Sequence, residues 1–413
     1  MPETGNDRFP RPKIAMEFLS KKINLNTGRW DDLKWGEHAH AFTVAHSVEA
    51  DVVDRIHGLL NKALADGEAF GTFKKNMVDM MKAEGWYGGA GHTADEKQYI
   101  NWRIQVIYDT NMKTAYAAEH YRKQLEIADM RPVWVYQSKL VGNNRRQDHV
   151  ALHDKAFRSD DPFWDTYYPP NGWGCDCTVI TKSVSGAERD GTEVLHSDDK
   201  GNPPPMQDKD GNPVDWQTFA DDTWKYNAGR EALAPNFRKY TNVPGDALKQ
   251  MYKAFSGSMD NTRLTQGEFK TLVRRTNEKD YLKMGINYQI GNLEEKRFEA
   301  LRNHNVPDSK IMGTDERLWH GTGDKNNDQK IPERLFDDLY ETLQTPESIY
   351  EEDVPAAKNN YRVFHFVKDT GDGKKIKVVL YQRNLKNSAT ALQLRSMGYS
   401  TYEYVDGKYK KIW

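Results

Sequence analysis

Apolar residues recur at helical spacing through the first third of the chain. Between positions 48 and 65 they lie three and four residues apart, and the Asp66-Gly67 pair that follows is typical of a helix end. A second helical pattern, rich in Met and Phe, runs from 69 to 84 and predicts a core-facing stripe. The run Thr93-Ala-Asp-Glu96 is a capping box, which predicts the start of a long helix ending near Ala128. At 1.5 Å per residue that helix would be roughly 50 Å long.

The pattern becomes strand-like after Pro132. Residues 133–136 and 177–181 are short runs of β-branched and aromatic residues, which predict two strands, and a short helical pattern at 145–155 lies between them. Residues 184–215 are rich in Gly, Pro, Asp and Lys, which indicates a linker or an exposed loop. Two further helical patterns follow, near 246–256 and 265–276.

The last 130 residues combine helices with alternating strands. The helical patterns come first, at 293–303 and 333–343. Alternating runs at 361–367 and 376–381 then face each other across the Asp369–Gly373 turn, which predicts a β-hairpin. Residues 401–413 predict a second hairpin, with Asp406-Gly407 at its turn.

These elements predict a multidomain α+β protein, since 413 residues exceed the size of one typical core. The predicted segments are an N-terminal helical domain with a long helix (1–130), a small α+β unit (131–183), a linker and helical connecting segment (184–282), and a C-terminal α+β domain with an antiparallel sheet (283–413).

Composition and charge narrow the classes of function. The formal net charge is -2, so the whole chain has no bias toward nucleic acid or membrane. No apolar run is long enough to span a bilayer, and the first residues lack the apolar core of a signal peptide. Two cysteines in this length indicate synthesis in a reducing cytoplasm. Residues 361–413 are the exception in charge, because eleven Lys and Arg stand there against four Asp and Glu.

The aromatic, irregular stretch from 145 to 177 holds the first candidate site. His149 and His153 are four residues apart on the predicted helix, and Cys175 and Cys177 are the chain's two cysteines. Two imidazoles and two thiolates complete a tetrahedral zinc site, so a structural zinc is one interpretation. Inert packing of the cysteines and a disulfide are the alternatives, and nothing electropositive beside the cysteines favours a catalytic thiolate.

Acidic residues in the same stretch have a simpler explanation. Asp160, Asp161 and Asp165 supply oxygen ligands for a hard cation, but a solvated acidic loop is the favoured interpretation. Asp161, directly before Pro162, is typical of a turn.

The C-terminal domain carries the residue types that metal-free RNA cleavage needs, namely a base, an acid and cations around a phosphate. The candidates are His320, Lys330, Arg334, His365, Lys377, Tyr381 and Arg383. His320, in the glycine-rich run 318–323, is predicted to lie in a turn. His365 alternates with apolar residues, which is equally typical of a histidine on a sheet face. A solvated basic face, or one that contacts packaged DNA phosphates, is the alternative.

An ordered series of motifs between about 37 and 181 resembles the minor head protein family of Mu-like phages, the F-protein-like head-morphogenesis family. The motifs are Glu37-His38, 41–45, Gly85-Trp86, 108–111, 115–118, Arg131-Pro132, Trp134, Tyr136, Arg146, His149, Leu152, His153, 160–164, 169–175 and Cys177. The family usually has Arg between the two cysteines, where this chain has Asp176.

The resemblance implies a minor capsid protein of the virion with no catalysis in its N-terminal two-thirds, made in the host bacterial cytoplasm. It would be located at the portal vertex and act in head assembly and genome packaging. Its implied partners are the portal protein, the major capsid or scaffold proteins, and packaged DNA. The resemblance also implies that the protein leaves the virion together with that DNA.

The last 130 residues resemble the phage-borne barnase/EndoU/colicin/RelE-like nuclease domains. Leu318-Trp319-His320, Pro346 and the strand from Lys377 to Arg383 carry this likeness. It implies His320 as acid or base, Lys377 and Arg383 as phosphate clamps, and Tyr381 as proton donor or positioning group. Three hypotheses follow. The chain is a purely structural virion protein, or it also delivers a toxin-like ribonuclease that acts on RNA. In the third, the C-terminal domain keeps the nuclease fold but only binds DNA or a partner. No cofactor is predicted beyond the candidate structural zinc.

Overall fold

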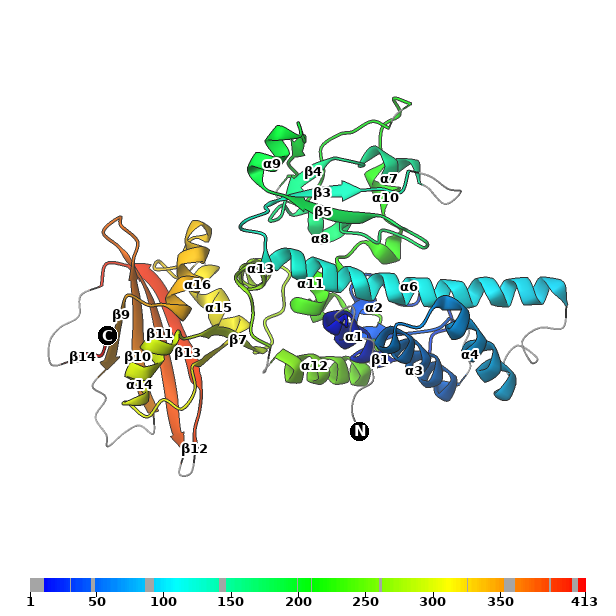
Figure 1. Cartoon of the computed structure of the whole chain (residues 1–413). Coiled ribbons are helices and arrows are strands. Elements are labelled where there is room, and N and C mark those ends of the chain that lie inside the picture. The colour runs from blue at the N-terminus through cyan, green and yellow to red at the C-terminus, as the bar shows by residue number, and fades with distance from the viewer. Residues whose placement is uncertain are drawn as a thin grey trace. The chain divides into compact units, whose positions relative to one another are not determined.

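The structure, a computed structural model, divides into two compact units, residues 1–252 and 253–413, each described by itself (Figure 1). The described residues are 11–29, 31–45, 49–85, 93–140, 146–198, 200–208, 210–259, 262–324, 326–352, 361–385, 388–402 and 408–413. The first unit is mainly helical and the second is rich in strands, which confirms the predicted α+β class.

Amphipathic helices form the first part of the N-terminal unit. The elements in this part are α1 (Lys13–Ser20), β1 (Ile23–Asn24), α2 (Glu37–His40), β2 (Ala41–Phe42), α3 (Ala50–Asp66), α4 (Phe70–Ala83) and α6 (Ala94–Glu126). The predicted Met and Phe stripe is core, since Phe73, Met77 and Met81 are buried on α4. Gly67 ends α3 in the left-handed conformation, as the Asp-Gly pair predicted.

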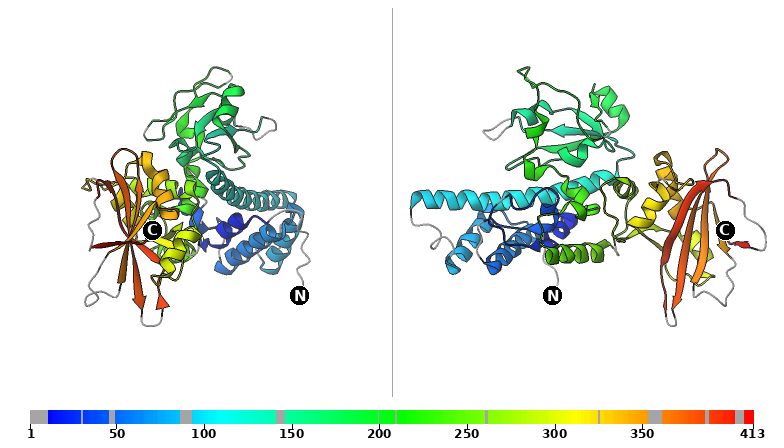
Figure 2. Two further views of the ribbon diagram at one scale, coloured as in Figure 1. Left: turned by 60° about the vertical axis from the view of Figure 1, so that its left-hand side comes forward. Right: turned by 180° about the vertical axis from the view of Figure 1, so that it is seen from behind.

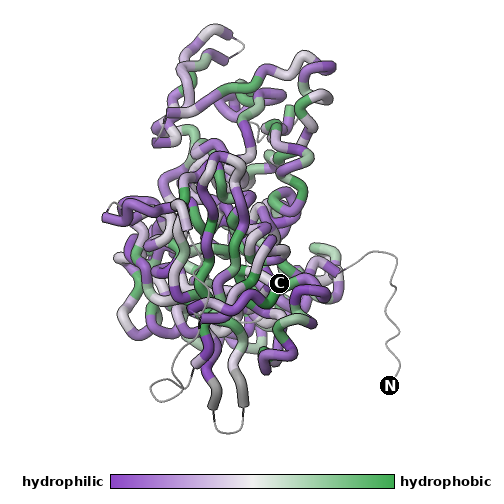
Figure 3. Tube along the Cα trace, turned by 90° about the vertical axis from the view of Figure 1, so that its left-hand side faces the viewer, coloured by the Kyte–Doolittle hydropathy of each residue, from purple (hydrophilic) through white to green (hydrophobic). Residues whose placement is uncertain are grey.

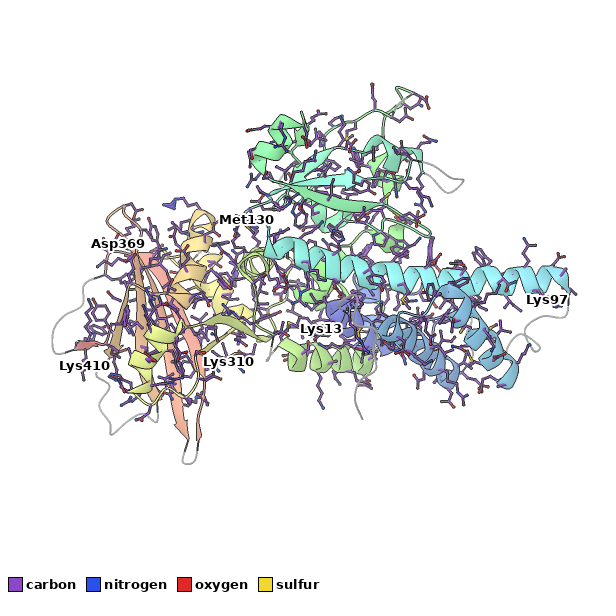
Figure 4. The ribbon with its side chains drawn as sticks, viewed as in Figure 1. Lys13, Lys97, Met130, Lys310, Asp369 and Lys410 are labelled. Atoms are coloured by element: carbon purple, nitrogen blue, oxygen red, sulfur yellow. The ribbon has the colours of Figure 1, made fainter. Side chains whose placement is uncertain are left out.

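Helix α6 is the long helix predicted from the capping box. The Thr93 hydroxyl accepts the backbone N–H of Glu96, and the Glu96 carboxylate accepts that of Thr93. Figure 4 labels Lys97 and Met130 at opposite ends of this rod, and Figure 2 shows it lying along α3 and α4. Its buried positions 100, 104 and 107 join the core of α1, α3 and α4.

A small sheet with strand order β5-β3-β4-β6 follows α6. Its elements are β3 (Val133–Gln137), α7 (Gln147–Ala151), β4 (Ala156–Arg158), α8 (Phe163–Tyr167), β5 (Thr178–Lys182), α9 (Val184–Arg189) and β6 (Val194–Leu195). Strand β3 pairs antiparallel with β4 and β5, and β6 joins β4 in parallel. The indole of Trp134, on β3, lies within 6.0 Å of the rings of Tyr121, Trp164 and Tyr168. This aromatic cluster joins the sheet to α6.

The segment predicted as a linker and connecting helices belongs largely to the N-terminal unit. It contains α9 and β6, then α10 (Trp216–Phe219), η1 (Asp222–Trp224), α11 (Ala228–Leu233), η2 (Phe237–Lys239) and α12 (Gly245–Met259). Helix α11 packs on α6 at Gly229, where an added Cβ would lie 2.6 Å from Tyr121 Cβ. The composition of residues 184–215 predicted exposure because the short polar elements in this range bury few side chains of their own.

The C-terminal unit is built on one mixed sheet of order β14-β9-β10-β11-β13-β8-β7, with β12 paired to β11. Its helices are α13 (Gln266–Asn277), α14 (Glu295–Arg302), α15 (Asp315–Thr322), η3 (Glu333–Leu335) and α16 (Phe336–Gln344). Its strands are β7 (Asn287–Asn292), β8 (Lys310–Thr314), β9 (Ser348–Glu352), β10 (Tyr361–Asp369), β11 (Lys375–Leu385), β12 (Ser388–Ala389), β13 (Leu392–Ser400) and β14 (Tyr409–Lys411). Figure 3 shows hydrophobic positions gathered in these strands and hydrophilic ones in the loops.

The predicted hairpin of residues 361–381 is confirmed as β10 and β11, which pair antiparallel from Tyr361↔Arg383 to Asp369↔Lys375. The turn of the second predicted hairpin, Asp406-Gly407, lies outside the described residues. The described strand from that region, β14, pairs antiparallel with β9. Among the described residues, no helix has the length and apolar character needed to cross a membrane.

Candidate functional site

The loop from Tyr168 to Cys177 is held by buried polar contacts rather than by strand pairing. Asn171 is fully buried, and its side-chain NH₂ donates to the Tyr136 hydroxyl at 3.1 Å and to the Tyr167 carbonyl at 2.9 Å. Gly174 has a φ of +69°, a left-handed conformation that favours glycine. The loop therefore leaves the sheet and returns to β5 along a fixed path.

Gly172 makes room for an ion pair that closes this loop. The Arg146 guanidinium donates to both carboxylate oxygens of Asp221, at 2.8 and 2.9 Å, and Asp221 Oδ2 also accepts the Trp173 backbone N–H at 3.2 Å. A Cβ on Gly172 would lie 2.5 Å from both Arg146 Nη1 and Asp221 Oδ2. Only glycine allows the pair to lie against the backbone here.

Gly172→Ala is therefore expected to destabilise the N-terminal unit by about 1–3 kcal/mol, because the new methyl group displaces the bidentate pair. Urea unfolding of the full chain measures the change. Gly58→Ala is the matched control: Gly58 is an exposed position of α3 with open space at its Cβ, so alanine should stabilise by about 0.5–1 kcal/mol. An unchanged unfolding free energy for Gly172→Ala would contradict this account.

Three of the four predicted zinc ligands converge beneath the loop. His149 comes from α7, Cys175 from the loop, and Cys177 directly precedes β5. Their ligand atoms all lie within 4.8 Å of one another. The imidazole Nδ1 of His149 is 3.7 Å from Cys175 Sγ and 3.5 Å from Cys177 Sγ. His149 and Cys175 are buried, Cys177 is half-buried, and both thiols are free.

A contact on the far side of the His149 ring fixes its orientation. Nε2 lies 2.9 Å from the Phe219 carbonyl, and the imidazole stacks on the Phe219 ring at 4.5 Å. Because a carbonyl only accepts, Nε2 carries the proton, and the lone pair on Nδ1 faces the two sulfurs. A histidine held in this way is typical of metal ligands.

The two thiols differ in proton affinity. The hydrogen bond from the Cys175 thiol lowers the pKa of Cys177, and the same bond together with burial raises the pKa of Cys175. Two thiolates and a neutral imidazole are ligands that zinc prefers.

His153 lies outside the group of three. Its Nδ1 accepts the Ser138 backbone N–H at 3.2 Å, and its Nε2 is 3.5 Å from Asp154 Oδ2. The expected common face with His149 is absent because α7 ends at Ala151 and the chain then turns toward β4. The four-ligand set is thus corrected to three.

Asp176, between the cysteines, points away from the site. Its carboxylate pairs with Lys113 on α6 and, at 2.6 Å, with Lys139. These two contacts, both through hydrogen bonds, lower the pKa of Asp176 against the opposing effect of its burial. The acidic residue therefore joins the loop to α6 and does not enter the cluster.

The other acidic residues of the stretch contact protein donors. Asp161 Oδ1 accepts the Phe163 backbone N–H at 2.9 Å, the turn contact predicted from Asp-Pro. Asp165 pairs with Arg230 at 3.0 Å, and Asp160 lies 3.3 Å from Arg158. Phe219 and Asp221, which support the cluster and the loop, were not predicted from sequence, because no local pattern links them to residues some 70 positions earlier.

The predicted nuclease residues lie on two faces of the C-terminal sheet. Lys377, Tyr381 and Arg383 alternate along β11 and share one face. Gly321, next to His320, packs against Met397, whose strand partner is Val378 on the opposite face. The structure therefore does not bring His320 together with the other three.

His320 lies in helix α15 and not in the predicted turn. Gly321 serves close packing, since a Cβ there would overlap the Met397 side chain. The imidazole of His320 is about half exposed, and its Nδ1 is 3.0 Å from Asp324 Oδ2.

A different histidine lies on the face with Lys377. His365 on β10 is buried, its Nε2 lies 3.5 Å from Glu352 Oε2 on β9, and its ring centroid is 5.0 Å from that of Tyr409. Burial first, then the positive charges of Lys377 and Arg395, lower the pKa of His365 to about 4. Lys377 itself lies over the Tyr402 ring at 3.9 Å. A neutral imidazole, a carboxylate and two cations therefore come together on this face.

Residues 54–180, which include α6, strands β3 and β4, the start of β5 and the His-Cys cluster, match a family of phage proteins described as "Phage Mu protein F like protein". This part of the chain is therefore similar to Mu F-like proteins.

Two curated proteins share the likeness. The chain is 37% identical over 175 residues to the "Mu-like prophage FluMu F protein" of Haemophilus influenzae, covering 42% of each chain. It is 31% identical over 195 residues to the "Putative capsid assembly protein F" of Escherichia phage Mu, covering 46% of this chain and 44% of that one. The match thus spans less than half the length of these relatives. No solved structure matches the chain.

Proposed function

We propose that this chain is a phage capsid assembly protein. The observation that carries the proposal is the match of residues 54–180 to the Mu F-like family. The phage Mu relative, described as "Putative capsid assembly protein F", adds to it. The capping-box helix, the aromatic cluster around Trp134 and the closed loop at Gly172 give this region a well-packed fold. A minor capsid protein needs such a fold to present a fixed surface to its assembly partners.

The finer part of the proposal is a location at the portal vertex, with the portal protein and the major capsid or scaffold proteins as partners. A role in packaging and ejection of DNA belongs to the same proposal. The basic character of residues 361–413 supports contact with DNA phosphates, since the rest of the chain carries a net negative charge.

The test is an amber codon at Lys97 in a prophage that encodes this chain. Induction in a non-suppressing host should give few infectious particles and aberrant or empty heads, and a suppressing host should restore normal particles. Quantitative mass spectrometry of purified virions should find the chain in a small fixed ratio to the portal protein. Normal yields of infectious virions that lack the chain would refute the proposal.

A second candidate function is RNA cleavage by the C-terminal unit, as a toxin-like effector delivered with the virion. The observation that favours it is the convergence of His365, Glu352 and Lys377 on one sheet face, with Arg395 adding positive charge. His365 and Glu352 are residue types that can supply a base, and the cations are suited to bind the scissile phosphate. Tyr381 and Arg383 lie on the same face of β11 and extend it.

The full chain is accordingly expected to cleave tRNA or total RNA in EDTA, and His365→Ala should reduce the rate by roughly 100-fold or more. Glu352→Gln should also reduce it. His320→Ala is the matched control and should leave the rate unchanged, because His320 belongs to the other face. A folded chain that leaves RNA intact would remove this candidate, and a loss confined to His320→Ala would return the role to the residue predicted from sequence.

A further inference from the structure

We propose that His149, Cys175 and Cys177 bind one zinc ion, through the imidazole Nδ1 and the two thiolate sulfurs. The proposal goes beyond a role in capsid assembly, because it concerns how the loop before β5 is held and does not depend on any partner.

The distances suit a shared metal ion. With Zn–N near 2.0–2.1 Å and Zn–S near 2.3 Å, two ligands at the tetrahedral angle are roughly 3.6 Å apart. The two measured separations from Nδ1 to sulfur are 3.5 and 3.7 Å. Both nitrogen-to-sulfur separations therefore already match a tetrahedral site, and all three ligand atoms lie within 4.8 Å of one another.

The protonation pattern also favours a metal over hydrogen bonds alone. The lone pair on Nδ1 faces both sulfurs, and one lone pair accepts only one strong hydrogen bond. A zinc ion between the three atoms satisfies the nitrogen and both sulfurs at once. The Phe219 carbonyl supplies the outer contact that orients a ligating histidine, and Asn171 holds the neighbouring Tyr136 hydroxyl in place.

Charge balance makes the buried site favourable. Zinc with two thiolates and a neutral imidazole has no net charge, so the ion and its ligands can be buried together at little electrostatic cost. Binding releases the remaining thiol protons to solvent, so occupancy should fall in acid.

The fourth coordination position belongs to an oxygen ligand such as water. Within the part of the chain that the structure describes, no other His, Cys, Asp or Glu joins the group of three. The Ser138 hydroxyl lies 3.7 Å from Cys177 Sγ. The ion would link α7, the loop and the start of β5, and its main effect is to stabilise this part of the fold.

The test begins with the full chain, purified under reducing conditions without added metal. Elemental analysis should give about one zinc per chain. Replacement by Co²⁺ should give the visible bands of a tetrahedral ion and a thiolate-to-cobalt charge-transfer band, which no oxygen-only site produces. Chelation at neutral pH should lower the thermal midpoint and expose two thiols to a thiol reagent.

Variants assign the ligands. Cys177→Ser and His149→Ala should lose the zinc and the charge-transfer band. His153→Ala is the control that should keep both, although His153 lies only four residues from His149. A folded, reduced wild-type chain without zinc and without cobalt bands would overturn the proposal, as would a Cys175–Cys177 disulfide in freshly purified protein. Loss of the metal in His153→Ala equal to that in His149→Ala would overturn the three-residue assignment.

Discussion

Trp134→Ala is expected to lower the free energy of unfolding of the N-terminal unit by roughly 3–5 kcal/mol. The indole is fully buried on the central strand β3, and its neighbours come from α6, α8 and the loop after α8. Truncation removes a large apolar area and leaves a cavity that the surrounding rings, fixed in tilted and edge-on packing, fill poorly.

Chemical denaturation of the full chain, followed by circular dichroism, measures this effect. Trp102→Ala is the control: Trp102 is 60% exposed on α6, so its loss should change stability by less than about 0.5 kcal/mol. Trp134→Phe should lie between the two, since it keeps most of the packing. Equal effects of the alanine substitutions at 102 and 134 would show that the aromatic cluster does not hold the unit together.

Lys22→Met is expected to stabilise the N-terminal unit at pH 7 by on the order of 3 kcal/mol, and to have little effect near pH 10. Lys22 is 7% exposed, and burial lowers its pKa to about 7, with the ring of Phe18 4.8 Å from its Nζ. In the unfolded chain the same group titrates near 10.4.

The direction in which stability changes with pH follows from these two pKa values. Above the unfolded pKa, Lys22 is neutral in both states and its burial does not lower stability. As the pH falls toward the folded pKa, the unfolded chain binds the proton more readily, and stability is lost. Wild-type stability should therefore rise between pH 7 and 10, while Lys22→Met should be flatter over that range.

Paired urea titrations of the two chains at several pH values test this. Lys75→Met, at an exposed position of α4, is the control and should leave the pH profile unchanged. The same slope in Lys22→Met as in the wild type would contradict the assignment.

Local patterns were sufficient for the long helices and the central hairpin of the fold. The capping box at Thr93, the Asp66-Gly67 stop and the alternating runs of β10 and β11 act over a few residues, so they predicted α6, the end of α3 and the central hairpin. They did not predict the short elements α9 and β6. A strand as short as β6, which joins a sheet at its edge, has little sequence signature of its own.

The sites were predicted only in part. The residue types of the metal group were visible, since both cysteines and His149 lie within 29 positions of one another. The structure places His153 outside the group of three, because helical spacing holds only while the helix continues, and α7 ends at Ala151. In the C-terminal unit, His365 had the pattern of a sheet-face histidine, and its location near Glu352 depends on how three strands pair.

The sequence by itself determined where the long helices and the central hairpin form and which motifs resemble those of Mu F-like proteins, because those features depend on neighbours a few residues apart. Only the tertiary structure decided which nitrogen of His149 faces the sulfurs, through a carbonyl 70 residues away. It also decided that Gly172 accommodates the pair of Arg146 with Asp221, and that Lys377 and His320 lie on opposite faces of a sheet. Such contacts arise from strand pairing and packing between distant segments, and no local pattern of residues specifies them.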